Sequence, residues 1–161
     1  MYFVFIYDNK YMKSDRDFFG DAIISFYPNE KKESNVFLLG QLIGAIEFFK
    51  GLVPTSNVEQ FSLDKLIFCL RPLNQQFLMV IASDQIALNS ELLLEKKLAI
   101  LFNLIKMVNG PISAKDRTDE DNYNKFKHQI NEITTICCES LFNTKNIAFD
   151  SYYSFVSKNL Q

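Results

Sequence analysis

Tryptophan is absent from this sequence of 161 residues, and glycine and proline are scarce, with five and four residues respectively. So few chain-breaking residues exclude a flexible linker and predict short loops. The 48% of hydrophobic residues, among them 16 phenylalanines, exclude a disordered segment and indicate a dense apolar core. A chain of this length is sufficient for one domain, without disulfides or metals, and we expect residues 1–161 to form it.

Histidine occurs once, and the motifs of catalysis and nucleotide binding are missing. The sequence has no GxxxxGK[ST] or GxGxxG loop to hold phosphate and no GxSxG elbow to present a nucleophile. His128, between Lys127 and Gln129, has the surroundings of a surface residue. The acidic run at 119–121 is typical of a helix start rather than of a general acid–base pair. We therefore expect no catalytic residues, no metal site and no cofactor.

The three cysteines, Cys69, Cys137 and Cys138, follow no regular spacing. An odd number of irregularly spaced cysteines predicts reduced thiols in an intracellular compartment. The adjacent pair at 137–138 indicates small apolar residues on a helix rather than metal ligands.

Long hydrophobic runs are also missing. The opening MYFVFIYDNK has no basic segment before its apolar residues and reaches Asp8 after a few of them, unlike a signal peptide. No run approaches the roughly 20 apolar residues that span a bilayer. We expect a cytoplasmic protein whose membrane association is indirect.

Neither sign of charge dominates, since 17 basic residues face 19 acidic ones and the net charge is -2. Nucleic-acid binding relies on concentrated Lys and Arg, so this balance argues against it. Between Asp8 and Asp17 basic residues are interspersed with acidic ones, which predicts a solvated surface turn.

Apolar runs and turn residues predict an α+β fold with the order β-β-α-β-β-β-α-α. Short connections indicate antiparallel pairing, and the near-continuous apolar strands need helices on both faces of the sheet. The expected strands cover residues 2–7, 22–27, 57–63, 65–71 and 76–83. The expected helices cover 34–52 and 90–108, a third begins at Thr118, and 147–160 forms a short terminal helix.

Local signals mark the helix ends. Ser34 or Asn35 is the expected N-cap of the first helix, which Gly51 and Pro54 close. The sequence Asn-Gly-Pro at 109–111 ends the second helix, because glycine tolerates a positive φ and proline cannot continue the helix. Thr118 is the expected N-cap of the third helix. Its predicted apolar stripe is Tyr123, Phe126, Ile130, Ile133, Cys137 and Leu141.

The first helix has more apolar surface than one sheet can cover. At 100° per residue, one face collects Leu38, Leu42, Ala45, Ile46, Phe49, Leu52 and Val53, which we expect on the sheet. The other side carries Gly40, Gly44 and Gly51, flanked by Val36, Phe37, Ile43 and Phe48, with Glu47 as its only charge. Glycines in a helix cost roughly 0.5–1 kcal/mol each, so we interpret this side as a docking groove for a partner. The alternative is that this chain's own loop or tail covers it.

Several stretches resemble a known family. The opening YFVFIYD, the later FYP, LLGQLIGAIEF, KLIFCLRP with FLMVIA, FNLIKMVNGPIS and ESLFN are similar to the first longin domain of the tri-longin Rab exchange-factor family. Within that family they look most like the Hermansky–Pudlak syndrome branch, in its four-type subunit. The likeness spans nearly the whole chain. It implies a five-stranded antiparallel longin sheet with one helix on one face and two on the other.

The resemblance also implies a function. Subunits of this branch pair with a Hermansky–Pudlak syndrome one-type longin subunit in the BLOC-three complex, a guanine nucleotide exchange factor for Rab GTPases. The complex serves the biogenesis of lysosome-related organelles such as melanosomes, to whose membranes, or to endosomes, it is recruited peripherally. Because such subunits carry further longin domains, the present chain is expected to be a fragment or a short form.

Longin domains place the third strand at the sheet edge, beside the first helix. Its free backbone groups are suited to extend a partner's sheet. Together with the glycine side of the helix, it forms the predicted heterodimer surface. The predicted partner-binding residues are Phe37, Gly40, Gly44, Glu47, Phe48, Gly51, Val58, Gln60 and Phe61.

Three alternatives stay open. The first is the equivalent domain of the Ccz-type endosomal subunit of the same family, although NGPIS and the GQ of the first helix favour the Hermansky–Pudlak branch. The second is an adaptor or SNARE longin without exchange activity, although the heptad helix of a SNARE is missing. The third is a small-molecule sensor, which needs a cavity with converging polar groups.

Overall fold

A computed structural model describes residues 2–11, 19–28, 32–52, 60–63, 66–84 and 90–142, with only the backbone described at 19–20, 32–38, 52, 61, 63 and 90–91. The element order confirms the predicted one and adds a short 3-10 helix before the second strand. The predicted helix at 147–160 lies outside the described residues. The elements are β1 (Tyr2–Asp8), η1 (Phe19–Ala22), β2 (Ile23–Tyr27), α1 (Lys32–Leu52), β3 (Gln60–Leu63), β4 (Leu66–Pro72), β5 (Phe77–Ser83), α2 (Ser90–Asn109) and α3 (Glu120–Phe142).

The five strands form one sheet in the order β2-β1-β5-β4-β3, and every neighbouring pair is antiparallel. β5 lies in the middle, where Ile81 faces Val4 of β1 on one side and Cys69 of β4 on the other. All seven residues of β5 are buried. Its apolar run thus suits a central strand covered on both faces.

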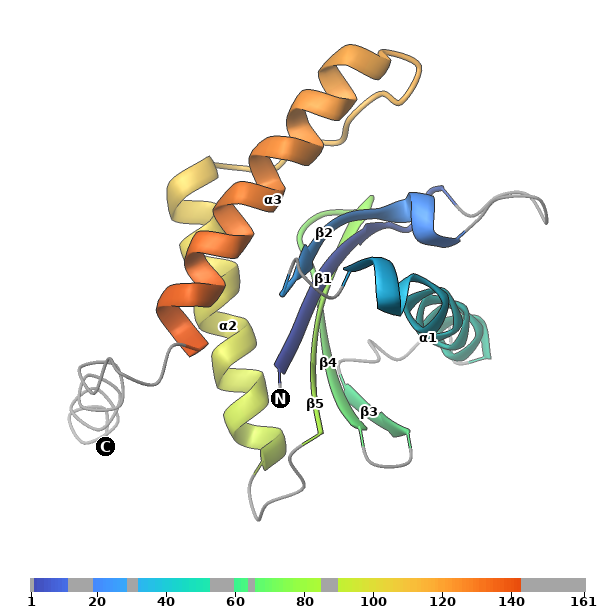
Figure 1. Ribbon diagram of the computed structural model, residues 1–161, viewed down its shortest axis with the longest axis vertical. Coiled ribbons are helices and arrows are strands. Elements are labelled where there is room, and N and C mark those ends of the chain that lie inside the picture. Colours follow the sequence, from blue (N-terminus) through green and yellow to red (C-terminus); the bar gives the residue numbers. More distant parts are fainter. Residues whose placement is uncertain are drawn as a thin grey trace.

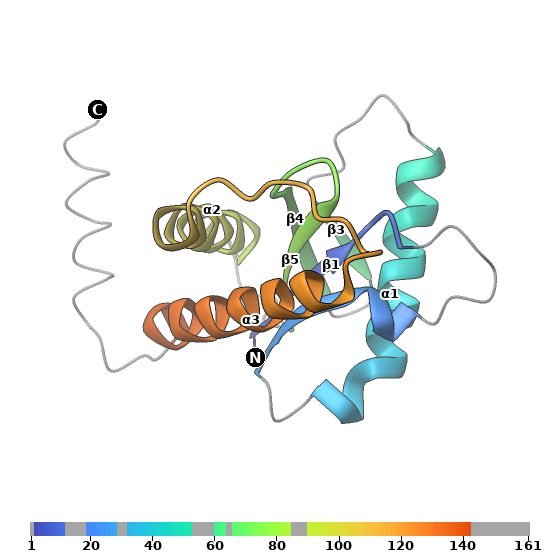
Figure 2. The same cartoon turned by 90° about the horizontal axis from the view of Figure 1, so that it is seen from above.

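Helices cover both faces of this sheet, with α1 on one side and α2 and α3 on the other (Figures 1 and 2). The side chains of β1 alternate accordingly, because successive residues of a strand point to opposite faces. Val4 and Ile6 enter the core beneath α2 and α3, while Phe5 and Tyr7 enter the core beneath α1. The predicted longin-like α+β architecture is confirmed.

The face that α1 turns to the sheet differs from the predicted one. Leu42 and Ile46 pack there as expected, together with Leu39. Ile43, expected on the partner side, is fully buried, and Phe49, expected in the core, is 38% exposed. Since α1 is apolar on nearly every side, the spacing of its residues did not fix its rotation.

The chain itself covers part of the glycine side of α1. The helix contacts η1, which precedes β2 (Figure 1). Gly40 is buried and Gly44 is half-buried, whereas Gly51 in the last turn is exposed. Along the described part of the predicted groove, the helix is thus covered at Gly40 and open at Gly51.

The end of α2 follows the sequence prediction, and the start of α3 corrects it. Gly110 adopts a φ of 74° and donates its N–H to the Lys106 carbonyl at 2.9 Å. At α3 the cap is Asp119, whose Oδ1 accepts the N–H of Asn122 at 3.3 Å. Thr118, the predicted cap, instead donates its hydroxyl to Asp116 at 2.8 Å. A carboxylate one residue closer to the helix thus replaces the threonine.

The predicted apolar stripe of α3 packs on the sheet. Tyr123, Phe126, Ile130 and Cys137 are buried, and Ile133 and Leu141 are partly buried against the same core. The three cysteines are buried and form no disulfide, as expected for reduced apolar residues. Burial raises the pKa of the Cys137 and Cys138 thiols. His128 is exposed, as predicted.

Asp8 is an exception to the predicted solvated turn, because it is fully buried at the end of β1. Its Oδ2 accepts hydrogen bonds from Gln76 Nε2 at 2.8 Å and from the Tyr123 hydroxyl at 2.9 Å. Its Oδ1 accepts the N–H of Lys10 at 3.0 Å, and Arg117 Nε lies 3.8 Å from Oδ2. The carboxylate therefore joins β1 to the β4–β5 turn and to α3.

Candidate protein-docking site

The two edges of the sheet differ in how they are covered. At the β2 edge, the N–H of Phe26 donates to Asn131 Oδ1 of α3 at 3.3 Å, and α3 packs along the strand. The helix thus occupies a backbone group that would otherwise be free to pair with another strand. The β2 edge is closed by the chain's own α3.

The β3 edge carries no such cover among the described residues. In the sheet order β3 has β4 as its single neighbour, and it pairs with it from Gln60↔Cys69 to Leu63↔Leu66. Gln60 and Ser62 are exposed. An exposed edge strand presents unpaired N–H and C=O groups to another chain. This confirms the prediction that the third strand lies at an edge.

The last turns of α1 expose two aromatic rings. Phe48 is 63% exposed, and its ring meets that of Phe49 edge to face, with centroids 5.9 Å apart. A Cβ built on Gly51 meets no atom within 4 Å. Large apolar side chains on a surface mark contact sites when they gather. The end of α1 is thus an apolar, sterically open surface.

Glu47, predicted to bind a partner, is engaged within the chain. Its Oε1 accepts a hydrogen bond from the Tyr7 hydroxyl at 2.7 Å. The same oxygen forms an ion pair with Lys50 Nζ at 2.9 Å. Burial and then the nearby Glu47 carboxylate raise the pKa of Tyr7. Glu47 therefore connects α1 to β1.

The nine predicted partner-binding residues thus fall into three groups. Phe48, Gly51 and Gln60 are exposed, whereas Gly40, Gly44 and Glu47 are covered or engaged to different degrees. The side chains of Phe37 and Phe61, and the whole of Val58, lie outside the described residues. Phe49 is the exposed residue that sequence reasoning missed. No signal in the spacing could have found it, because α1 is apolar on nearly every side and only its rotation decides which residues face the sheet.

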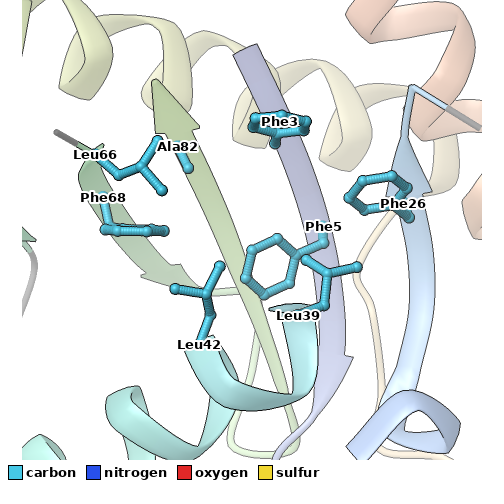
Figure 3. A pocket seen from close by; sticks show the side chains of 8 residues that line it. All are labelled: Phe3, Phe5, Phe26, Leu39, Leu42, Leu66, Phe68 and Ala82. Carbon is cyan, nitrogen blue, oxygen red and sulfur yellow. The ribbon is translucent and has the colours of Figure 1, made fainter. Parts of the chain in front are cut away.

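A small apolar hollow lies between α1 and the sheet (Figure 3). Its volume is about 20 Å³, room for no more than one water molecule. A ligand pocket needs hundreds of cubic ångströms and some converging polar groups. This hollow therefore does not support the small-molecule sensor. Its lining is Phe3, Phe5, Phe26, Leu39, Leu42, Leu66, Phe68 and Ala82.

The described residues hold neither a cluster of metal ligands nor a membrane-spanning helix. No three His, Cys, Asp or Glu side chains gather there as metal ligands would. In that same part of the chain, none of the helices has the length and hydropathy of a membrane-spanning segment.

The chain matches a known protein family. The family described as "First Longin domain of INTU, CCZ1 and HPS4" matches residues 1–110. The match runs from β1 through the end of α2, so it includes β3 and α1, the two elements of the docking site. A search of curated proteins gave no match.

Proposed function

Because this chain belongs to the family of first longin domains shared by INTU, CCZ1 and HPS4, we propose that it is a docking domain of a heterodimeric Rab exchange factor. It pairs with the longin domain of a partner subunit and contributes to the surface that binds the GTPase. Within the family, the stretches quoted above favour the Hermansky–Pudlak branch, with a one-type partner subunit in the BLOC-three complex. The proposed complex acts in the biogenesis of lysosome-related organelles.

The observation that carries the proposal is the difference between the two sheet edges. Asn131 of α3 closes the edge at β2, while β3 has one neighbouring strand. A second sheet can therefore be added on one side, by pairing with Gln60–Leu63. The exposed rings of Phe48 and Phe49 offer apolar area on the helix that precedes this strand.

Exchange activity needs no catalytic residue in this domain. An exchange factor binds the nucleotide-free GTPase more tightly than the loaded form, so by linkage it weakens nucleotide binding by the same factor. The exchange factor weakens nucleotide binding by holding the switch segments of the GTPase in another conformation. A shaped surface of two paired domains is sufficient for that.

Co-purification with a Hermansky–Pudlak one-type subunit tests the pairing. We expect Phe48→Asp to abolish co-purification, since it places a charge in the proposed interface, while the isolated domain stays folded because Phe48 is exposed. Val108→Asp is the matched control, an exposed apolar residue of α2 on the other side of the sheet. Equal retention of the partner by both variants would refute the proposed surface.

Release of labelled GDP from Rab proteins tests the exchange. We expect the wild-type pair to accelerate release, and the Phe48→Asp pair to fail unless its subunits are covalently joined. Pairing without accelerated release from any Rab would favour the adaptor alternative. Pairing with the partner of the Ccz-type subunit in place of the one-type subunit would favour the Ccz-type alternative.

A further inference from the structure

The hydrogen bonds of the sheet determine which backbone groups β3 turns outward. Successive residues of a strand direct their N–H and C=O groups to opposite sides, so one known bond between two strands fixes the pattern of both. Asn9 donates its N–H to the Gln76 carbonyl at 2.8 Å, in line with the register of β1 and β5. Leu73 donates its N–H to the Phe77 carbonyl at 2.9 Å, in line with the register of β4 and β5. Gln76 therefore faces β1 and Phe77 faces β4, and the residues of β5 alternate from there.

The alternation continues through β4 to β3. The odd-numbered residues of β4 bond β5, as Leu73 does, so the even-numbered ones face β3. Phe68 of β4 is paired with Phe61 of β3, and this pair therefore exchanges hydrogen bonds. Gln60 and Ser62, on either side of Phe61, thus direct their N–H and C=O groups to the outer side of β3 (Figure 1).

Two other features agree with this pattern. In β1 the even-numbered residues face β2, so the pair Ile6↔Ser25 is of the bonded kind. Phe26 must then direct its N–H outward, where Asn131 Oδ1 accepts it at 3.3 Å. Pro72, which has no N–H, occupies a position of β4 that faces away from β5. The same alternation therefore accounts for both edges of the sheet.

The side chains of Gln60 and Ser62 leave this outer side free. Gln60 is paired with Cys69 and Ser62 with Ile67, and both of these β4 residues enter the core beneath α2 and α3. Directly opposite residues share a face of the sheet, so the exposed side chains of Gln60 and Ser62 lie on the α2–α3 face. Side chains stand above or below a sheet, whereas N–H and C=O groups lie in its plane. An incoming strand therefore meets the backbone of these two residues.

We propose that the backbone N–H and C=O groups of Gln60 and Ser62 bind the edge strand of the partner longin domain, which runs antiparallel to β3. This inference rests on the proposed function and names the contact within it. Two domains of one fold that join by the same edge are related by a two-fold axis, which makes the joined strands antiparallel. Gln60 then lies opposite the partner's equivalent of Ser62, and Ser62 opposite the equivalent of Gln60. The partner residues at these positions share the exposed α2–α3 face, which suits polar side chains.

Amide hydrogen exchange of the full chain, followed by NMR, tests the edge pattern without a partner. We expect the N–H groups of Gln60 and Ser62 to exchange at least about tenfold faster than that of Phe61, which donates to β4. Adding the one-type subunit should slow exchange at Gln60 and Ser62. Slow exchange at both residues in the dilute isolated chain would show that the chain covers its own edge. Protection that appears only at high concentration would identify a second copy, and either result rejects the proposal.

Proline at position 62 tests the binding itself. Ser62→Pro removes an N–H that β4 does not use, so the urea midpoint should stay near that of the wild type. Affinity for the one-type subunit should fall about tenfold or more, because a carbonyl of the partner loses its donor. Ser62→Thr is the matched control, since it keeps the N–H and should retain the partner. Gln60→Pro, at the first residue of β3, repeats the test should Ser62→Pro unfold the chain.

The remaining outcomes separate this inference from the proposed function. A Ser62→Pro chain that binds the subunit as the wild type does rejects the backbone contact. Equal loss of binding in Ser62→Thr assigns the contact to the side chain and rejects it as well. A wild-type chain that does not bind the subunit overturns the proposed function together with the partner named here. The exchange pattern of the isolated chain decides independently which groups the edge presents.

Discussion

At the scale of single residues, the side chain of Asp8 connects segments that are far apart in the sequence. It is fully buried and bonded to Gln76 and Tyr123, which lie 68 and 115 residues away in the sequence. Gln76 continues the connection, since its Oε1 accepts the N–H of Lys115 at 2.8 Å. A buried carboxylate is tolerated only with such partners, because its desolvation costs several kcal/mol.

Replacing Asp8 with alanine should destabilise the fold strongly. The variant leaves the buried polar groups of Gln76 and Tyr123 without their acceptor, and removing one partner of such a network costs about 3–5 kcal/mol. We expect a lower urea midpoint with an unchanged slope. Glu95→Ala, at an exposed position of α2, should change the midpoint little. A loss below about 1 kcal/mol for Asp8→Ala would show that the network contributes little.

Tyr7 and Tyr123 should make stability fall at high pH. Burial is the main cause that raises the pKa of both hydroxyls, followed by Glu47 for Tyr7 and Asp8 for Tyr123. Their contribution is complete below the unfolded pKa of about 10 and is lost as the pH rises above it towards the folded value. Each should steepen the decline by about 1.4 kcal/mol per pH unit.

Urea midpoints measured from about pH 9 to pH 11 check this prediction, since the range brackets the unfolded tyrosine pKa. Tyr7→Phe and Tyr123→Phe should each be less stable near neutral pH but lose stability less steeply above it. A slope identical to that of the wild type in both variants would assign the alkaline decline to other groups.

At the scale of elements, α1 shows what apolar spacing can and cannot predict. The existence of the helix was evident from its composition, and its end follows Gly51 as expected. Its rotation was not evident, because Ile43 and Phe49 are equally apolar and only the sheet distinguishes them. The rotation also determines the surroundings of two predicted partner-binding residues, since Gly40 is buried and Glu47 bonds Tyr7 of the same chain.

Local chemistry predicted some boundaries better than others. The end of α2 was predictable because one residue, Gly110, adopts the positive φ that ends the helix. The cap of α3 was misassigned because Asp119 and Thr118 both accept hydrogen bonds, and the nearby Asp116 decides between them. Burial of Asp8 was not predictable from the neighbouring charges, since its partners come from distant segments. Sequence patterns thus gave the order of elements but not the long-range polar contacts.

Asn131 should control the state of the β2 edge. Asn131→Ala leaves the N–H of Phe26 without its acceptor, which should cost about 1–3 kcal/mol for a buried donor. It also exposes an edge, so we expect concentration-dependent self-association in sedimentation. Glu132→Ala, its exposed neighbour on α3, serves as the control. A monomeric Asn131→Ala variant of unchanged stability would show that α3 closes the edge without this bond.

At the scale of the whole molecule, the family match and the folded unit do not coincide. The match ends at residue 110, whereas α3 covers β2 and packs on α2 beyond it. Residues 1–110 alone would expose the buried faces of Ile6, Ile24 and Phe77, which belong to the core beneath α3. Asp8 would also lose Tyr123.

A chain cut after residue 110 should therefore fail to fold as a monomer. We expect aggregation or a collapsed state that binds the dye ANS, with circular dichroism lacking a cooperative thermal transition. The chain cut after residue 142 is the matched control and should unfold cooperatively, because it retains all the described elements. Cooperative unfolding of residues 1–110 would show that α3 is dispensable.

Closure of one sheet edge has a consequence for stoichiometry. A domain that could add strands at both edges would polymerise, since every addition would leave a new end to extend. Among the described residues one edge of this sheet, that of β3, is left uncovered, so the proposed pairing through β3 would join two domains and stop at a pair. In the proposed pair, the contact of α3 with β2 at one edge of the sheet would thus limit the number of subunits that join at the other edge.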